Sequence, residues 1–300
     1  MSVPEVRVVD PRRGGPGATL RAYVQLTKPR IIELLLTTTI PPMIVAAAGW
    51  PGWWLVVATL VGGTLSAGGA NTINQVIDRD IDSVMARTRG RPIPTGRISP
   101  TAAFVFGVVL GLAGFAWLWV TTNLLAAALS TAGLLVYVLA YSLYLKRSTT
   151  QNIVIGGAAG AFPTLVGWVA VTGELALLAW IMFAIVFFWT PPHFWALALR
   201  YQEDYAAAEV PMLPVVVGSA VTVDHILLYS FVTVGVSLLL YPAGPMGWIY
   251  LAAALLLGLW LIVGAVRLRR DADRAMKYFT VTNGYLAGIF LAIALDALLV

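Results

Sequence analysis

The chain consists of long apolar segments separated by short polar connections. From about residue 31 onward, each apolar segment is close to the roughly 20 residues that a helix needs to cross a bilayer. Nine such segments follow one another, at 31–49, 53–77, 101–121, 124–144, 153–172, 175–199, 222–242, 246–266 and 279–299. The pattern predicts an all-α, polytopic membrane protein with nine transmembrane helices.

The first 20 residues follow a different pattern. They are polar, rich in proline and glycine, and without hydrophobic periodicity, which predicts a disordered cytosolic tail over residues 1–20. No apolar stretch precedes a small-residue cleavage site, so the segment is unlike a signal peptide. We therefore expect residues 21–300 to form a single transmembrane domain.

The charged residues predict how the helices are oriented. All 19 lysines and arginines fall in five groups, at 7–30, 79–97, 146–147, 200 and 267–277. With nine helices these groups share one side of the membrane, which the positive-inside rule makes cytoplasmic. The N-terminus is then cytoplasmic and the C-terminus outside. The net charge of +5 reflects this topology and not nucleic-acid binding. Every acidic residue except Glu174 and Asp296 lies on the same side, which predicts a functional site there.

The composition narrows the chemistry. Hydrophobic residues make up 59% of the chain and charged residues 11%, and there is no cysteine. Disulfides, thiolate metal sites and a cysteine nucleophile are therefore excluded. The chain also lacks a Walker loop, a G-x-G-x-x-G fingerprint and a Ser/His/Asp arrangement, so nothing favours an ATPase, a dehydrogenase or a hydrolase. Glycines at helical spacing predict close helix packing at positions 107, 111, 156, 157 and 160.

The strongest motif is NQVIDRDIDSVMARTRGRPIP, at residues 74–94. Asn74, Asp78 and Asp82 are spaced four residues apart at the end of the second helix, so they share one helical face. Carboxylates at this spacing repel one another, and Mg²⁺ would relieve the repulsion. Asp80 lies off that face, and we expect Arg79 to pair with it.

Three arginines, Arg87, Arg89 and Arg91, follow the acidic residues. Guanidinium groups bind phosphate through paired hydrogen bonds. A solvated helix end with mixed charges is the alternative explanation of the motif. The asparagine one turn earlier, the three arginines and the membrane boundary favour a site for a metal ion and a diphosphate.

N-x-x-x-D-x-x-x-D at the end of the second of nine helices resembles the first motif of the UbiA-type intramembrane prenyltransferases. Four further stretches are similar to the haem-farnesylating branch of that family, at 26–43, 87–94, 145–168 and 189–216. The resemblance implies transfer of a farnesyl group from farnesyl diphosphate to the 2-vinyl group of haem B, with addition of water. The products would be haem O and diphosphate. It also implies Mg²⁺ as cofactor, contact with membrane lipid and a haem A synthase as downstream partner.

The resemblance also implies roles for single residues. Asn74, Asp78 and Asp82 look like metal ligands, and the basic residues that hold the diphosphate would be Lys28, Arg87, Arg91, Lys146 and Arg147. For Lys146 and Arg147, a plain topology signal after a membrane helix is an equally good explanation.

The second acidic region, RYQEDY, departs from the D-x-x-x-D of the wider family. Tyr201 and Tyr205 occupy the flanking positions, which leaves Asp204 as the expected ligand there. Glu209 stands where the haem-farnesylating branch usually has glycine.

Aromatic residues are the candidates for contacts with the other reaction partners. Tyr141, Tyr144, Phe194 and Trp195 could stabilise an allylic cation through their ring faces, or could belong to the interfacial aromatic belt. His193 lies in TPPHFW, where Pro191 and Pro192 predict a kink. Neutral histidine is a common iron ligand, so we expect His193 and Trp195 to contact the haem. A satisfied core histidine is the alternative.

Two other functions stay open at this point. A prenyltransferase with another acceptor, such as a quinone precursor, would share the first motif but not the TPPHFW stretch. A secondary transporter would carry charges near the midplane of the membrane, whereas the charges here lie at one edge. The basic loops and short tail favour a multi-pass protein of the bacterial plasma membrane with a cytoplasmic active site.

Overall fold

The computed structural model describes residues 15–30, 32 and 37–299, and they form helices without any strand. The predicted all-α class is therefore confirmed for these residues. The α-helices are α1 (Pro16–Thr27), α3 (Ile40–Ala46), α4 (Trp53–Ile77), α5 (Arg79–Val84), α6 (Pro100–Thr121), α7 (Leu124–Leu135), α8 (Lys146–Ser148), α9 (Asn152–Gly156), α10 (Ala158–Thr172), α11 (Leu177–Arg200), α12 (Gln202–Ala207), α13 (Leu213–Ala243), α14 (Trp248–Arg270) and α15 (Ala275–Leu299). A π-helix, η2 (Val136–Leu145), joins α7 to α8, and a 3₁₀-helix, η3 (Ala272–Arg274), precedes α15.

Eight stretches of helix in the described part of the chain are long and apolar enough to cross a membrane. They correspond to eight of the nine predicted segments. The remaining segment, 31–49, includes residues 31 and 33–36, which lie outside the described residues, so the count of nine stays a prediction. Helix α1 begins at Pro16 and overlaps the tail predicted for residues 1–20, of which 1–14 lie outside the described residues.

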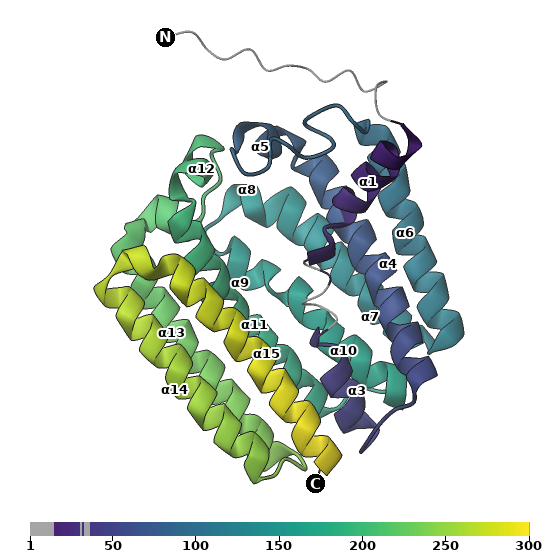
Figure 1. Ribbon diagram of the computed structural model, residues 1–300, viewed down its shortest axis with the longest axis vertical. Helices are drawn as coiled ribbons and strands as arrows, with labels where there is room; N and C mark the ends of the chain where they lie inside the picture. Colours follow the sequence, from purple (N-terminus) through teal and green to yellow (C-terminus); the bar gives the residue numbers. More distant parts are fainter. Residues whose placement is uncertain (1–14, 31, 33–36, 300) are drawn as a thin grey trace.

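The helices form one bundle with two different ends (Figure 1). Helices α5, α8 and α12 gather at one end, here called the charged end, whereas α3 and the C-terminal end of α15 lie at the opposite end. Exposed tryptophans mark that opposite end, where Trp53 and Trp54 begin α4 and Trp248 begins α14. Tryptophan is enriched at membrane–water interfaces, so this end fits a membrane boundary.

Close approach between helices depends on glycine at several of the predicted positions. A Cβ atom on Gly69 of α4 would lie 2.6 Å from the carbonyl oxygen of Gly107 in α6, which is too close for any side chain. Gly156 and Gly157 likewise face Tyr141 and Thr190. The prediction was wrong for Gly160, where a Cβ would meet nothing within 4 Å, because this position faces open space.

Two helices depart from the predicted course. α11 runs as one helix through Pro191 and Pro192, so the expected kink does not interrupt it. The Thr190 hydroxyl donates a hydrogen bond to the Val186 carbonyl one turn back, at 2.8 Å. The interruption lies instead in α13, which begins at Leu213 and not at 222, and whose backbone leaves helical geometry at Gly218 (φ 79°, ψ 169°).

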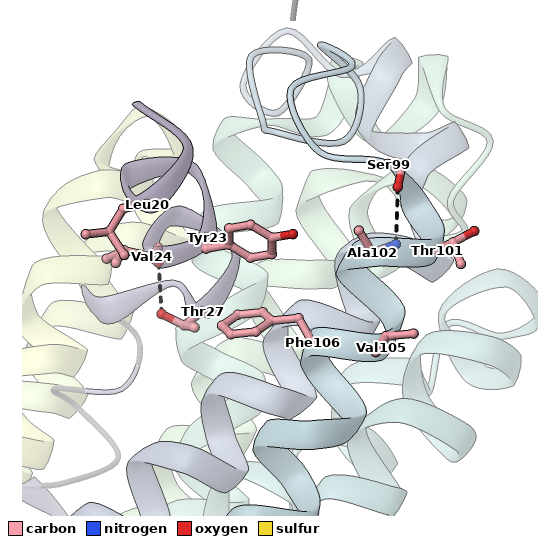
Figure 2. Close-up of a pocket in the computed structure, with 9 residues that line it drawn as sticks. All are labelled: Leu20, Tyr23, Val24, Thr27, Ser99, Thr101, Ala102, Val105 and Phe106. Atoms are coloured by element: carbon pink, nitrogen blue, oxygen red, sulfur yellow. Dashed lines mark hydrogen bonds between the residues drawn. The ribbon is translucent and has the colours of Figure 1, made fainter. Parts of the chain in front are cut away.

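Helix α1 is held against the bundle at the charged end. Ala22 and Leu26 pack with Ile93, Ile98 and Ala103, and all five side chains are buried. Beside this cluster an apolar groove of about 790 Å³ opens between α1 and α6 (Figure 2). None of its lining side chains is a predicted site residue, and Thr27, the last residue of α1, is one of them.

Candidate active site

The predicted acidic motif lies at the charged end, where α4 gives way to α5. Asp78 caps α4 and has a backbone conformation (φ −85°, ψ 10°) outside the regular helix. Its N–H donates to the Asn74 carbonyl at 2.9 Å, and the Asp82 N–H donates to the Asp78 carbonyl at 2.7 Å. Asn74, Asp78 and Asp82 therefore face the interior from two short-linked helices, and not from one continuous helical face as expected.

Asp78 is the centre of a buried polar network that joins four elements. Asn74 Nδ2 donates to Asp78 Oδ2 at 2.8 Å and to Ser142 Oγ at 2.9 Å. Lys28 Nζ donates to Asn74 Oδ1 at 2.7 Å, and Lys146 Nζ donates to Asp78 Oδ2 at 2.6 Å. Because the Asp78 side chain is only 2% exposed, its charge must be balanced by these neighbours and not by water.

One oxygen of the Asp78 carboxylate has no hydrogen-bond donor among the described residues. Asp78 Oδ1 is buried and accepts no hydrogen bond, and the guanidinium of Arg147 lies 4.0 Å away. A buried anionic oxygen without a donor is costly, and it is an oxygen that a hard cation such as Mg²⁺ would bind.

Asp82 has its own cationic partner. The Nη1 of Arg91 lies 2.8 and 2.7 Å from the two carboxylate oxygens of Asp82. The Asp82 side chain is buried, whereas Arg91 is partly exposed. Arg91 therefore holds the loop that follows α5 against the second predicted metal ligand.

Asp80 points away from the network, as predicted, but its partner is not Arg79. Its side chain is 62% exposed and forms a two-pronged ion pair with Arg147, at 2.7 Å for each oxygen. This hydrogen bonding holds the pKa of the Asp80 carboxyl well below its usual range. Arg147 also donates to the Ile77 carbonyl at 3.0 Å. The pairing with Arg79 was wrong because α8 brings Arg147 beside the start of α5.

Lys28 reaches the network from the end of α1. Burial, together with the nearby positive charge of Arg91, lowers the pKa of its amine to about 7, although Asp78 and Asp82 act in the opposite direction. Its backbone has a left-handed conformation (φ 53°, ψ 64°), which is uncommon for a residue with a side chain.

The second acidic region contacts the first through two of its tyrosines, Tyr201 and Tyr205, which lie against Arg87. The guanidinium carbon of Arg87 lies 5.6 Å from the ring centre of Tyr201. Tyr205 is buried, and burial raises the pKa of its hydroxyl, while Arg87 and Arg91 act to lower it. α12 therefore places Tyr205 beside the arginines of the first motif.

Asp204 is not joined to the other predicted ligands. Its carboxylate makes no hydrogen bond or ion pair with any residue that the structure describes. Within the described ranges, no group of three His, Cys, Asp or Glu side chains lies close enough to hold a metal ion. Asn74 and Asp78 are in direct contact, but the four expected ligands do not form one ready-made set.

The departure at Glu209 has a local explanation. Glu209 follows the end of α12 with a left-handed backbone (φ 54°), the conformation for which glycine is usually chosen. The N–H of Val210 donates to the Tyr205 carbonyl and that of Glu209 to the Ala206 carbonyl, both at 3.0 Å. Position 209 thus closes a helix.

The π-helix carries the predicted aromatic residue Tyr141, and it adds Ser142 and Tyr137, which the sequence pattern missed. Ser142 Oγ donates to the Tyr137 carbonyl five residues earlier, at 2.8 Å, and accepts from Asn74. The rings of Tyr137 and Tyr141 stack with centres 5.7 Å apart. A serine within the apolar run YVLAYSLY was the only available signal. π-helical segments are frequent at functional sites, where they redirect side chains.

His193 and Trp195 lie on different faces of α11. The His193 ring is stacked between Trp189 and Phe279, at centroid distances of 4.2 and 4.4 Å, and its Nδ1 lies 2.9 Å from Thr282 Oγ1. Trp195 is buried against α13, with its ring 5.3 Å from that of Tyr229. The structure therefore does not bring the two predicted haem contacts together.

The UbiA prenyltransferase family matches residues 34–293. The chain belongs to the UbiA prenyltransferase family. It is therefore a prenyltransferase, and the acidic and basic cluster at the charged end is its candidate active site.

Two relatives of this prenyltransferase match along nearly the whole chain, and both are named protoheme IX farnesyltransferase. The protein from Gloeobacter violaceus is 54% identical over 94% of this chain and 93% of its own length. The protein from Synechococcus sp. is 55% identical over 92% of this chain and 84% of its own length.

Solved structures share the fold of this prenyltransferase at low sequence identity. A digeranylgeranylglyceryl phosphate synthase superposes with a TM-score of 0.78 at 19% identity, covering 94% of this chain and 100% of its own. A UbiA homologue from Archaeoglobus fulgidus, bound to GPP and Mg²⁺, gives a TM-score of 0.60 at 16% identity and covers 91% and 99% of the two chains.

Asp78 and Asp80 offer a matched pair of variants. Asp78→Ala is expected to lower kcat/KM for prenyl transfer by at least about a thousandfold, because it removes the buried carboxylate at the centre of the network. Asp80→Ala should lower it by less than about tenfold, because an exposed ion pair contributes little. Steady-state kinetics of both purified variants, with thermal unfolding as the control for folding, checks this. Equal losses in the two variants would contradict the assignment.

Proposed function

We propose that this prenyltransferase transfers the farnesyl group of farnesyl diphosphate to the 2-vinyl group of haem B, with addition of water, and releases haem O and diphosphate. The observation that carries the proposal is the 54–55% identity, over more than nine-tenths of the chain, with proteins named protoheme IX farnesyltransferase. The buried carboxylates and the lysines and arginines around them supply groups that a diphosphate substrate needs.

We propose Mg²⁺ as the cofactor, with Asn74, Asp78, Asp82 and Asp204 as the residues that hold it. The buried Asp78 Oδ1 without a hydrogen-bond donor supports this set, since a hard cation would satisfy it. The relative from Archaeoglobus fulgidus was solved with Mg²⁺ and GPP. Bound Mg²⁺ supplies positive charge that makes diphosphate a better leaving group.

The diphosphate would be held by the basic residues, namely Lys28, Arg87, Arg91, Lys146 and Arg147. Lys146 and Arg91 balance the charges of Asp78 and Asp82 in the structure. If these carboxylates held a metal ion, Lys146 and Arg91 would be available to donate to diphosphate oxygens without leaving a buried charge unpaired. In this proposal, Lys146 and Arg91 are paired with Asp78 and Asp82 until the diphosphate binds.

The aromatic side chains at the site would protect the allylic cation. Tyr137 and Tyr141 present stacked rings beside the network, and Tyr205 lies near Arg87. Their faces can stabilise a carbocation, and their bulk can exclude water until the acceptor attacks. Tyr144 and Phe194 are more exposed, which favours a role at the lipid or solvent surface.

The charged end would face the cytoplasm of a bacterial cell with the enzyme in the plasma membrane. The support is the distribution of lysine and arginine, which the positive-inside rule assigns to that side. The chain has no native cysteine, so an Arg89→Cys variant can be labelled alone from either side of sealed vesicles. A haem A synthase would be the downstream consumer of the product.

The function is tested with haem extracted from membranes that contain the protein. With farnesyl diphosphate and Mg²⁺ added, haem B should be converted to a more hydrophobic haem that elutes later in reversed-phase chromatography and has the mass of haem O. Membranes carrying Asp78→Ala are the control and should leave haem B unchanged. A prenylated quinone precursor with unchanged haem would favour the other acceptor.

We further propose that His193 contacts the haem and transfers no proton. Its Nδ1 is engaged by Thr282, and its Nε2 makes no hydrogen bond with any described residue. His193→Ala is expected to weaken haem binding about tenfold and to shift the haem absorption spectrum, with unchanged affinity for farnesyl diphosphate. Titration with haem, followed spectroscopically, measures both. An unchanged spectrum and affinity would make His193 a packed core residue.

A further inference from the structure

Two side-chain amides of α4 hold the C-terminal end of α1. Gln75 Nε2 donates to the carbonyl of Leu26 at 2.8 Å and to that of Gln25 at 3.5 Å. Asn71 Nδ2 donates to the carbonyl of Thr27 at 2.9 Å. The last carbonyls of a helix have no partner within the helix, so these amides satisfy the carbonyls of Leu26 and Thr27. The Gln25 carbonyl also accepts from the Lys28 N–H, at 3.3 Å. Thr27, at the end of α1, is visible in Figure 2.

The contacts end where the backbone of α1 changes direction. Lys28 follows Thr27 with φ 53° and ψ 64°, a left-handed conformation that is strained for a residue with a Cβ atom. Such a conformation persists only where the surrounding structure enforces it. Here it directs the Lys28 amine to Asn74 Oδ1, 2.7 Å away.

One face of α4 carries both the amides that bind α1 and the polar residues of the candidate active site. Asn71, Asn74, Gln75 and Asp78 stand at positions i, i+3, i+4 and i+7, so they form one stripe along the helix. All four are almost fully buried, with exposed fractions of 4%, 3%, 1% and 1%. Asn71 and Gln75 therefore bind α1 within one helical turn of the residues that form the site.

We propose that Asn71 and Gln75 are positioning residues that fix the Lys28 amine against Asn74 and so prepare it to bind the diphosphate. The last part rests on the proposed function, whereas the positioning of Lys28 does not. If the amides only attached α1 to the bundle, their loss would leave the Lys28 amine where it is and its reactivity unchanged.

The positioning is tested on the free protein by lysine acetylation, because the chain has only three lysines, at 28, 146 and 277. Gln75→Met removes the amide donor and keeps the side-chain length. It should raise the acetylation rate of Lys28 at least about threefold, since an amine released from Asn74 samples more conformations. The rate at exposed Lys277 should stay unchanged. Mass spectrometry of the protein in detergent gives each rate separately, and an unchanged rate at Lys28 in both Gln75→Met and Asn71→Leu would overturn the proposal.

A double-mutant cycle tests the link to the diphosphate, with inorganic diphosphate and Mg²⁺ as the calorimetric probe. Gln75→Met should weaken binding about tenfold in the native background but less than about twofold in the Lys28→Ala background, because it acts through Lys28. An equal loss in both backgrounds would overturn the proposal, since the glutamine would then act independently of Lys28. Absence of diphosphate binding in the native protein would count against the proposed function, and the acetylation rates would still decide the positioning.

Discussion

The structure of the charged end depends on one buried carboxylate. Asp78 carries its charge at the junction of α4 and α5, where its side chain is 2% exposed. An anion in that position must be balanced within the protein. The balance comes from Lys146 directly and from Lys28 through Asn74, so α1, α4 and α8 have to meet at this point.

Several irregular features of the fold follow from that requirement. The π-helix ends at Leu145, directly before Lys146. It also places Ser142 within hydrogen-bond distance of Asn74. The left-handed backbone at Lys28 brings a second amine from the other side. Each feature costs conformational energy locally, and each supplies a polar contact to the same network. Strain of this kind concentrates at functional sites, where the surrounding packing compensates for it.

The sequence was sufficient to predict eight membrane helices and to select the acidic residues that the structure buries at the charged end. Apolar segments of spanning length predicted eight stretches of helix that the structure contains. The acidic motif grouped Asp78 with Asp82, and both are buried in the structure. Other features depend on long-range contacts that no local pattern encodes. Arg147 lies 67 residues from Asp80, and its choice over neighbouring Arg79 is decided by where α8 packs.

The sequence pattern did not separate the two predicted haem contacts. His193 and Trp195 are two residues apart, and such residues point in nearly opposite directions on an α-helix. The kink expected in α11 rested on the two prolines, and the structure shows that the helix continues through both of them without interruption. The roles of Asn71 and Gln75 were not predicted, because the motif was defined by its charged residues. Buried amides that bind the end of a helix need hydrogen-bond partners just as buried charges need ionic ones.

The central claim is that Asp78 and Lys146 are a mutually dependent buried pair. A double-mutant cycle on the free energy of unfolding, with Asp78→Asn, Lys146→Met and the combined variant, tests it most directly. The account predicts that each single variant is strongly destabilised by the unpaired charge it leaves, and that the double variant recovers stability, with a coupling energy of about 2 kcal/mol or more. Additive losses, with a coupling near zero, would contradict the account.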